Sequence, residues 1–127
     1  MPEKLLFEYA VIRVVPRVER EEFLNVGVIL YCKDRKFLDT IYKVSRERLR
    51  ALCAELDCGE VEEHLLSFER IRAGDAEGGP IGELDIASRF RWLTATRSTV
   101  VQTSKVHPGF CTNPKQTLQR LYEQLVL

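Results

Sequence analysis

The sequence predicts an α+β domain, in which a small, mostly antiparallel sheet of about four strands has helices packed on one face. Three strand-like segments come first, helical segments follow, and a fourth strand precedes the final helix, without the strict alternation that a parallel α/β sheet requires. The chain has 127 residues, of which 45% are hydrophobic and 30% charged. This size and composition fit one globular domain over residues 1–127.

Four segments have the composition of strands: residues 5–15, 26–32, 37–44 and 99–106. The first is rich in β-branched and aromatic side chains and ends at Pro16. The second is almost entirely apolar, which indicates a central strand covered on both faces. Gly27 inside it indicates a bulge or a close approach by another backbone. We expect the fourth strand to end at His107-Pro108-Gly109.

Capping residues mark where the helices begin. Ser45 precedes an amphipathic helix over about 46–56, and Asn113 followed by Pro114 starts the final helix. A second helix begins near Glu60 and stops at Gly74, and a short helix through Phe90, Trp92 and Leu93 is capped by Asp85 or Ser88. The glycine-rich segment 74–82 matches no nucleotide-binding fingerprint, so we expect a surface loop, with a lid as the alternative.

Charge is divided unevenly along the chain. Residues 1–85 hold 13 basic and 18 acidic residues, whereas residues 86–127 hold 6 basic residues and 1 acidic residue. The net charge of zero is therefore −5 in the first part and +5 in the second. Residues 86–122 contain no Asp or Glu at all. A surface of one sign attracts the opposite sign, so this segment is where we expect an anion or an acidic partner to bind.

Several classes of protein are disfavoured. The four cysteines lack the C-x-x-C spacing of zinc and redox sites, and the two histidines are too few for a His-rich metal site, so no metal or cofactor is expected. No apolar run approaches the roughly 20 residues that span a bilayer, and the N-terminal residues do not resemble a secretory signal. A cytoplasmic location is therefore expected. Cys111 and His107 lack a third catalytic group, so no catalytic residues are assigned.

Arg13 lies between apolar residues of the first strand, where a guanidinium needs a partner. One interpretation is structural: an ion pair with Glu22 or Glu8, or a strand end at which Arg13 reaches solvent. The alternative is an arginine held by the sheet to bind a carboxylate or phosphate. Asn25 at the next strand's entrance suits a turn or a ligand. The run Arg97-Ser98-Thr99 offers a guanidinium, hydroxyls and backbone N–H groups to an anion. The candidate ligand-binding residues are Arg13, Glu22, Asn25, Arg97, Ser98, Thr99 and Gln102.

Two motifs carry a resemblance to a known family. They are Tyr9 to Pro16 followed by Glu22 to Ile29, and Phe90 to Ser104, and the final helix with Leu118 and Leu121 also fits. Together they resemble the uncharacterised bacterial family "domain of unknown function 3037", across nearly the whole chain. The family brings no established activity. Its members are often encoded beside a HipA-type serine/threonine kinase, so the resemblance implies such a kinase as a candidate partner.

Three functions compete. The first is a noncatalytic interaction module whose basic face docks on an acidic protein surface. The second is nucleic-acid or nucleotide binding, with Trp92, Phe90 and Phe110 stacking on bases, although a pI near 6.7 is low for that role. The third is an enzyme acting on a phosphorylated small molecule, with Arg13 and Arg97 holding the anion and Glu22 as acid or base. The absence of a catalytic set favours the first.

Overall fold

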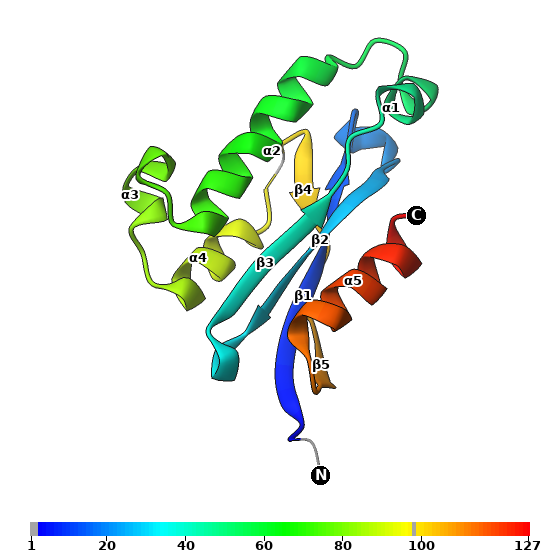
Figure 1. Cartoon of the computed structure of the whole chain (residues 1–127). Coiled ribbons are helices and arrows are strands. Elements are labelled where there is room, and N and C mark those ends of the chain that lie inside the picture. Colours follow the sequence, from blue (N-terminus) through cyan, green and yellow to red (C-terminus); the bar gives the residue numbers. More distant parts are fainter. Residues whose placement is uncertain (1–2, 98) are drawn as a thin grey trace.

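A five-stranded antiparallel sheet forms the centre of the protein in a computed structural model, which describes residues 3–97 and 99–127 (Figure 1). The strands are β1 (Leu5–Val14), β2 (Leu24–Cys32), β3 (Phe37–Tyr42), β4 (Val101–Thr103) and β5 (His107–Cys111). Their order is β3-β2-β1-β4, and β5 also pairs with β1, on the side away from β2. The predicted α+β class and antiparallel sheet are confirmed.

The helices are α1 (Arg46–Leu52), α2 (Cys58–Ala73), α3 (Gly79–Gly82), α4 (Ile86–Leu93) and α5 (Pro114–Leu125), with 3-10 turns η1 (Val18–Arg20), η2 (Lys33–Arg35) and η3 (Ala76–Gly78). α1, α4 and α5 begin at capping residues that the sequence indicates, whereas α2 begins two residues before the expected Glu60, with Asp57 as its cap. Side chains of the N-cap residues of four α-helices accept a backbone N–H from the first turn: Ser45, Asp57, Asp85 and Asn113. These caps satisfy backbone donors that the helices cannot satisfy themselves.

The helices cover both faces of the sheet, where the sequence predicted one. Figure 1 shows α2 and α4 on one side of the sheet and α5 on the other. One core lies beneath α2 and α4, and a second lies beneath α5. The physical reason lies in β2, where Val28, Ile29 and Leu30 are all fully buried. Because successive side chains of a strand point to opposite faces, such a run requires a cover on each side.

The fourth predicted strand continues further than expected. β4 and β5 both run antiparallel to β1, and the register shifts by one residue between them, because Thr103 lies opposite Ile12 and His107 opposite Tyr9. His107-Pro108-Gly109 therefore lies within a strand, and the prediction that it ends one was wrong. Pro108 is tolerated because an edge strand has no neighbour on its outer side to receive the missing N–H.

A second irregularity lies on the other side of β1. The register between β1 and β2 shifts between Ile12 and Arg13, opposite Gly27 and Asn25. A Cβ atom on Gly27 would lie 2.5 Å from the Cβ of Tyr42 and 2.6 Å from the carbonyl oxygen of Ile41. The prediction of a bulge or a close backbone approach at Gly27 is confirmed, and both occur.

Two segments differ locally from expectation. α1 ends at Leu52, four residues before the predicted end, because Cys53 adopts an extended conformation. The glycine-rich segment 74–82 forms η3 and α3, which contact α2, and is not an irregular loop. An ion pair of 3.1 Å between Arg70 and Glu77 joins it to α2. In the described part of the chain, no helix has the length and apolar character needed to cross a bilayer.

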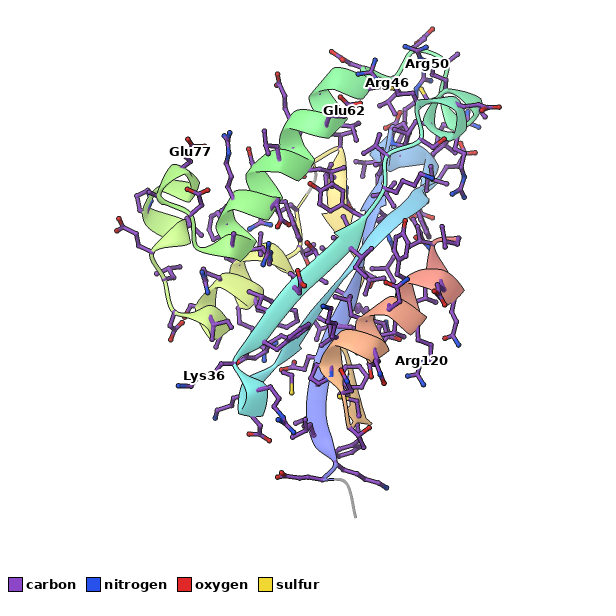
Figure 2. The ribbon with its side chains drawn as sticks, viewed as in Figure 1. Lys36, Arg46, Arg50, Glu62, Glu77 and Arg120 are labelled. Atoms are coloured by element: carbon purple, nitrogen blue, oxygen red, sulfur yellow. The ribbon has the colours of Figure 1, made fainter. Side chains whose placement is uncertain are left out.

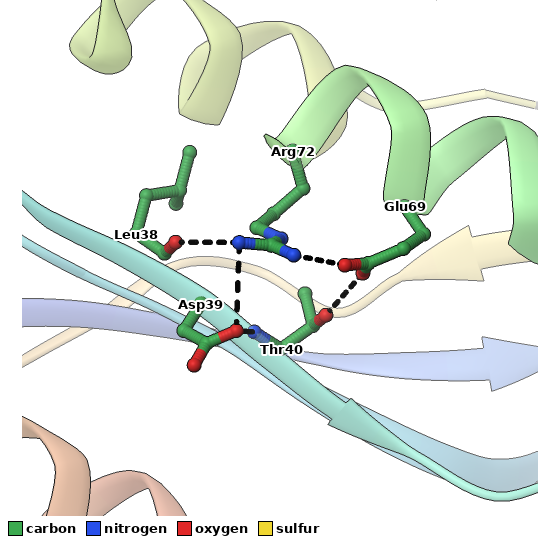
Figure 3. A network of polar contacts seen from close by, with 5 residues as sticks. All are labelled: Leu38, Asp39, Thr40, Glu69 and Arg72. Atoms are coloured by element: carbon green, nitrogen blue, oxygen red, sulfur yellow. Dashed lines mark hydrogen bonds and ion pairs between the residues drawn. The ribbon is translucent and has the colours of Figure 1, made fainter. Parts of the chain in front are cut away.

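A polar network joins α2 to β3 at the edge of the sheet (Figure 3). Arg72 on α2 forms an ion pair with Glu69, lies 3.6 Å from a carboxylate oxygen of Asp39, and donates to the Leu38 carbonyl oxygen at 3.5 Å. Glu69 also accepts a hydrogen bond of 2.7 Å from the hydroxyl of Thr40. The network fixes the long helix against an edge strand.

Candidate functional site

The register of the sheet brings three of the predicted site residues into one row. Arg13 on β1 lies opposite Asn25 on β2 and opposite Gln102 on β4. Residues directly opposite each other in a sheet project to the same face. That face is the one covered by α5, because the Asn25 side chain donates a 3.1 Å hydrogen bond to the carbonyl oxygen of Leu125 at the end of this helix.

Arg13 has no counter-charge in the described part of the chain. Its Cζ atom lies 4.0 Å from the centroid of the Phe23 ring, and its Nε is buried without a hydrogen-bond partner. No carboxylate of the described residues lies within ion-pair distance of it. Burial lowers the pKa of the Arg13 guanidinium, since the charged form loses hydration and gains no anion in return.

The two acidic partners expected for Arg13 are engaged elsewhere. Glu22 forms an ion pair with Arg20 of η1, and Glu8 accepts hydrogen bonds of 2.7 and 2.9 Å from Arg91 of α4. Glu8 is five residues from Arg13 along β1 and therefore points to the opposite face. The predicted structural ion pair between Arg13 and either glutamate was wrong.

Asn25 and Gln102, the other two residues of the row, form hydrogen bonds within the protein. Asn25 binds the end of α5 through its amide nitrogen, and its Oδ1 is buried without a partner. Gln102 donates to the carbonyl oxygen of Thr99 at 2.9 Å, and the hydroxyl of Thr99 donates to the carbonyl oxygen of Val101 at 2.6 Å. In this row Arg13 is therefore the side chain that has neither a hydrogen bond nor an ion pair with the described residues.

Arg97 lies at the end of α4. Its Cζ atom is 4.6 Å from the centroid of the Trp92 ring, and its guanidinium donates to the Trp92 carbonyl oxygen. Burial lowers its pKa, as for Arg13. Arg97 and Gln102 both line a recess of about 20 Å³, which holds about one water molecule at most. Ser98, also a predicted site residue, lies outside the described residues.

The cations of residues 86–122 do not gather on one surface. Arg91 is neutralised by Glu8, whereas Arg120 projects from α5 on the other side of the sheet (Figure 2). Figure 1 places α4 and α5 on opposite faces. The uneven charge along the chain therefore does not become a single basic patch, because the second half of the chain contributes to both layers.

Arg13 borders none of the four best-formed hollows of the described surface. The pocket between η1 and α1 has a volume of about 300 Å³ and is walled by Arg17, Arg20, Glu22 and Glu55, with Cys53. The pockets beside the start of α5 and beside α4 have volumes of about 390 and 320 Å³. Arg13 thus lies outside these hollows, which are the concave places where a small molecule is most readily enclosed.

The described residues offer little for catalysis. Burial raises the pKa of the Cys111 thiol, which is opposite to what a nucleophilic cysteine needs. The ring of His107 lies against Tyr9, with 5.3 Å between the centroids. All four cysteines are free thiols, and the described residues contain no group of three or more His, Cys, Asp or Glu that is arranged to hold a metal ion.

Phe23 is the residue of this site that sequence reasoning missed. Its ring lies under the Arg13 guanidinium while 45% of its surface stays exposed. A signal was present, because Phe23 and Asn25 are two positions apart and share a face of an extended segment. Its contact with Arg13 could not be predicted without knowing the register between β1 and β2.

The comparisons with known proteins give one family. A family model described as "Protein of unknown function (DUF3037)" matches residues 9–126. The chain belongs to this family. The predicted resemblance is thereby confirmed over nearly its whole length, including both motifs. Searches of the curated proteins and of the solved structures gave no significant match. For this DUF3037 chain, function must therefore be argued from its own residues.

Proposed function

We propose that this DUF3037 chain is a noncatalytic interaction module that binds an acidic group of a partner protein at Arg13. One observation supports this above the others. Arg13 is held by a central strand, stacked on Phe23 and partly desolvated, yet the described residues supply no anion for it. An unpaired, partly buried charge lowers stability, so its presence favours a partner outside the chain.

The surroundings of Arg13 favour a protein partner over a small metabolite. Phe23 covers one side of the guanidinium, which leaves its edge to make paired hydrogen bonds with a carboxylate. The pockets of about 300, 390, 20 and 320 Å³ on the described surface do not include Arg13, whereas small-molecule sites are concave. A site that combines an arginine with an aromatic residue is typical of protein interfaces.

The partner that we would test first is a HipA-type kinase, because the family resemblance implies it as a neighbour. A cytoplasmic location in a bacterium, expected from the sequence, accords with such a partner. An acidic region on that kinase would supply the carboxylates for Arg13.

Binding measured at low salt with two probes, the purified neighbouring kinase and poly-glutamate, tests the proposal. Arg13→Gln is compared with Arg35→Gln, because Arg35 is an exposed arginine without an ion pair in the distant η2 turn. We expect Arg13→Gln to weaken binding of at least one probe roughly 10- to 100-fold, and Arg35→Gln to change it less than about 3-fold. Equal effects of the two substitutions, or no binding at low salt, would overturn the proposal.

The two alternatives find less support. Phe90 is fully buried and cannot stack on a base, although Trp92 and Phe110 are 43% and 69% exposed. A single-stranded oligonucleotide is the third probe, and binding to it alone would favour the nucleic-acid function. For the enzyme alternative, Glu22 pairs with Arg20 and lines a pocket that neither Arg13 nor Arg97 borders.

A further inference from the structure

The sheet has two free edges, and the β3 edge is partly closed by side chains. Lys43 donates to the Val26 carbonyl oxygen at 2.9 Å, so the alternation of an antiparallel pair leaves the backbone groups of Leu38 and Thr40 pointing outward. Arg72 binds the carbonyl oxygen of Leu38, and Asp39 accepts the N–H of Thr40 at 2.8 Å (Figure 3). Groups that another strand would need are therefore already occupied.

The β4 edge is occupied at one carbonyl oxygen and free at Thr103. Val15 donates to the Val100 carbonyl oxygen at 2.7 Å and Ser104 donates to the Val11 carbonyl oxygen at 2.8 Å. By the same alternation, Gln102 bonds to β1, whereas the backbone groups of Val101 and Thr103 point away from it. The carbonyl oxygen of Val101 already accepts from the Thr99 hydroxyl. Within the described residues, the N–H and C=O of Thr103 have no hydrogen-bond partner, and no strand lies beyond β4.

This open edge is short. On one side, regular pairing ends after Thr103, where the register against β1 shifts by one residue, and further on Pro108 has no N–H to offer. Bulges and prolines are the usual devices that prevent sheets from joining edge to edge over long stretches. β4 is thus an edge that accepts a short strand and resists indiscriminate association.

The charges around β4 select the kind of strand. Arg97 precedes β4 and Lys105 follows it, and neither forms an ion pair with a described carboxylate. No Asp or Glu occurs in residues 86–122. A residue of an added strand that faces Gln102 lies on the same face as Arg13, two strand spacings or about 10 Å away. A glutamate at this position of the added strand can extend across Gln102 and contact the guanidinium of Arg13.

We propose that the β4 edge binds an acidic, extended segment of a partner protein as an additional strand, with a carboxylate that faces Gln102 and reaches Arg13. This inference rests on the proposed function and names its binding mode, because backbone pairing gives affinity and the acidic side chain gives specificity. The other occupants of such an edge, a second copy of this chain or a neutral strand, are separate outcomes of the test.

The test uses the full chain and a pool of peptides about nine residues long that alternate β-branched residues with Asp, Glu, Ser or Gln. We expect selection at low salt to enrich acidic peptides. Replacing their acids with Lys is expected to weaken binding more than 10-fold, as is N-methylation of alternate peptide N–H groups. Binding should also slow hydrogen exchange of the Thr103 amide. Thr103→Pro, which removes an outward N–H and no bond to β1, should abolish binding without unfolding the sheet.

The outcomes separate this inference from the proposed function. Acidic peptides that need Arg13 but tolerate N-methylation, and leave Thr103 exchange unchanged, would overturn strand addition and leave docking at Arg13 standing. The same conclusion follows if no acidic peptide is enriched while poly-glutamate or the kinase binds through Arg13. If none of these probes binds, both strand addition at β4 and the proposed docking at Arg13 are overturned. Self-association of the chain that Thr103→Pro abolishes would assign the edge to a second copy and overturn the inference.

Discussion

The guanidinium of Arg13 lies over the ring of Phe23, with 4.0 Å between Cζ and the ring centroid. This contact holds a cation at the surface of a central strand without neutralising it. An arginine stacked on an aromatic ring keeps its hydrogen-bonding edge free for a carboxylate. The contact between Arg13 and Phe23 therefore positions a guanidinium for binding, and the unpaired charge lowers folding stability.

Arg13→Met should raise the free energy of unfolding by about 1 kcal/mol, because it removes a desolvated charge and keeps an apolar stem against Phe23. The measurement is urea unfolding at neutral pH. Arg97→Met is the comparison, and it should not be stabilising, because Arg97 donates to the Trp92 carbonyl oxygen at the end of α4. A clear loss of stability in Arg13→Met would show that Arg13 is structural.

Gly27→Ala should destabilise the protein by about 3 kcal/mol. The added Cβ atom would meet Tyr42 and Ile41 on β3 at 2.5 and 2.6 Å, at a position where Gly27 itself is buried. Gly59→Ala in α2 is the control, and it should change stability by less than about 1 kcal/mol because its Cβ meets a side-chain oxygen at 3.2 Å. Thermal and urea unfolding give both values, and similar losses would refute the close approach at β2.

Ser104→Ala should cost about 1–2 kcal/mol of stability. The hydroxyl of Ser104 accepts the N–H of Val11 at 2.8 Å, at the point where the register against β1 shifts between β4 and β5. Without it, a partly buried backbone donor of β1 loses its partner. Ser67→Ala makes the same chemical change at an exposed position of α2 and should be neutral within about 0.5 kcal/mol. Faster exchange of the Val11 amide in Ser104→Ala would locate the effect, and unchanged exchange would contradict it.

Much of the fold was predictable because its signals are local. The cap at Asn113 with Pro114, the cap at Ser45 and the apolar run of residues 26–32 each depend on a few neighbouring residues. The position of α5 was not predictable in this way. Its apolar stripe shows that one side is buried, but the face of the sheet that it covers depends on how β5 pairs with β1, about 100 residues earlier in the chain.

Residues of the site could be predicted from the sequence, but the contacts that they make could not. Arg13 was identified because a charge inside an apolar strand is unusual, but the row with Asn25 and Gln102 exists only once the bulge near Gly27 sets the register. Glu22 was assigned to Arg13 by residue type, whereas a 3-10 turn places Arg20 nearer. Long-range register is the information that local patterns lack.

Arg72→Met should reduce stability by roughly 1–2 kcal/mol, because the network joining α2 to β3 loses its central cation. Arg70→Met, two positions earlier on the same helix, removes an exposed ion pair with Glu77 and should cost less than about 0.5 kcal/mol. Both variants are compared by urea unfolding. If the two losses are equal, the network does not fasten the helix to the edge strand.

Stability in acid should depend on Asp85, the N-cap of α4. Hydrogen bonds from the side chain and backbone of Ser88 lower the pKa of the Asp85 carboxyl below its ordinary value. A carboxyl whose pKa is lower in the folded state contributes stability that is present above its unfolded pKa and lost as pH falls through its folded pKa. The loss should therefore occur below about pH 4.

Asp85→Asn retains a capping oxygen without the charge, so the difference in unfolding free energy between wild type and variant should shrink as pH falls through this range. A difference that stays constant with pH would show that the Asp85 charge does not stabilise the helix start.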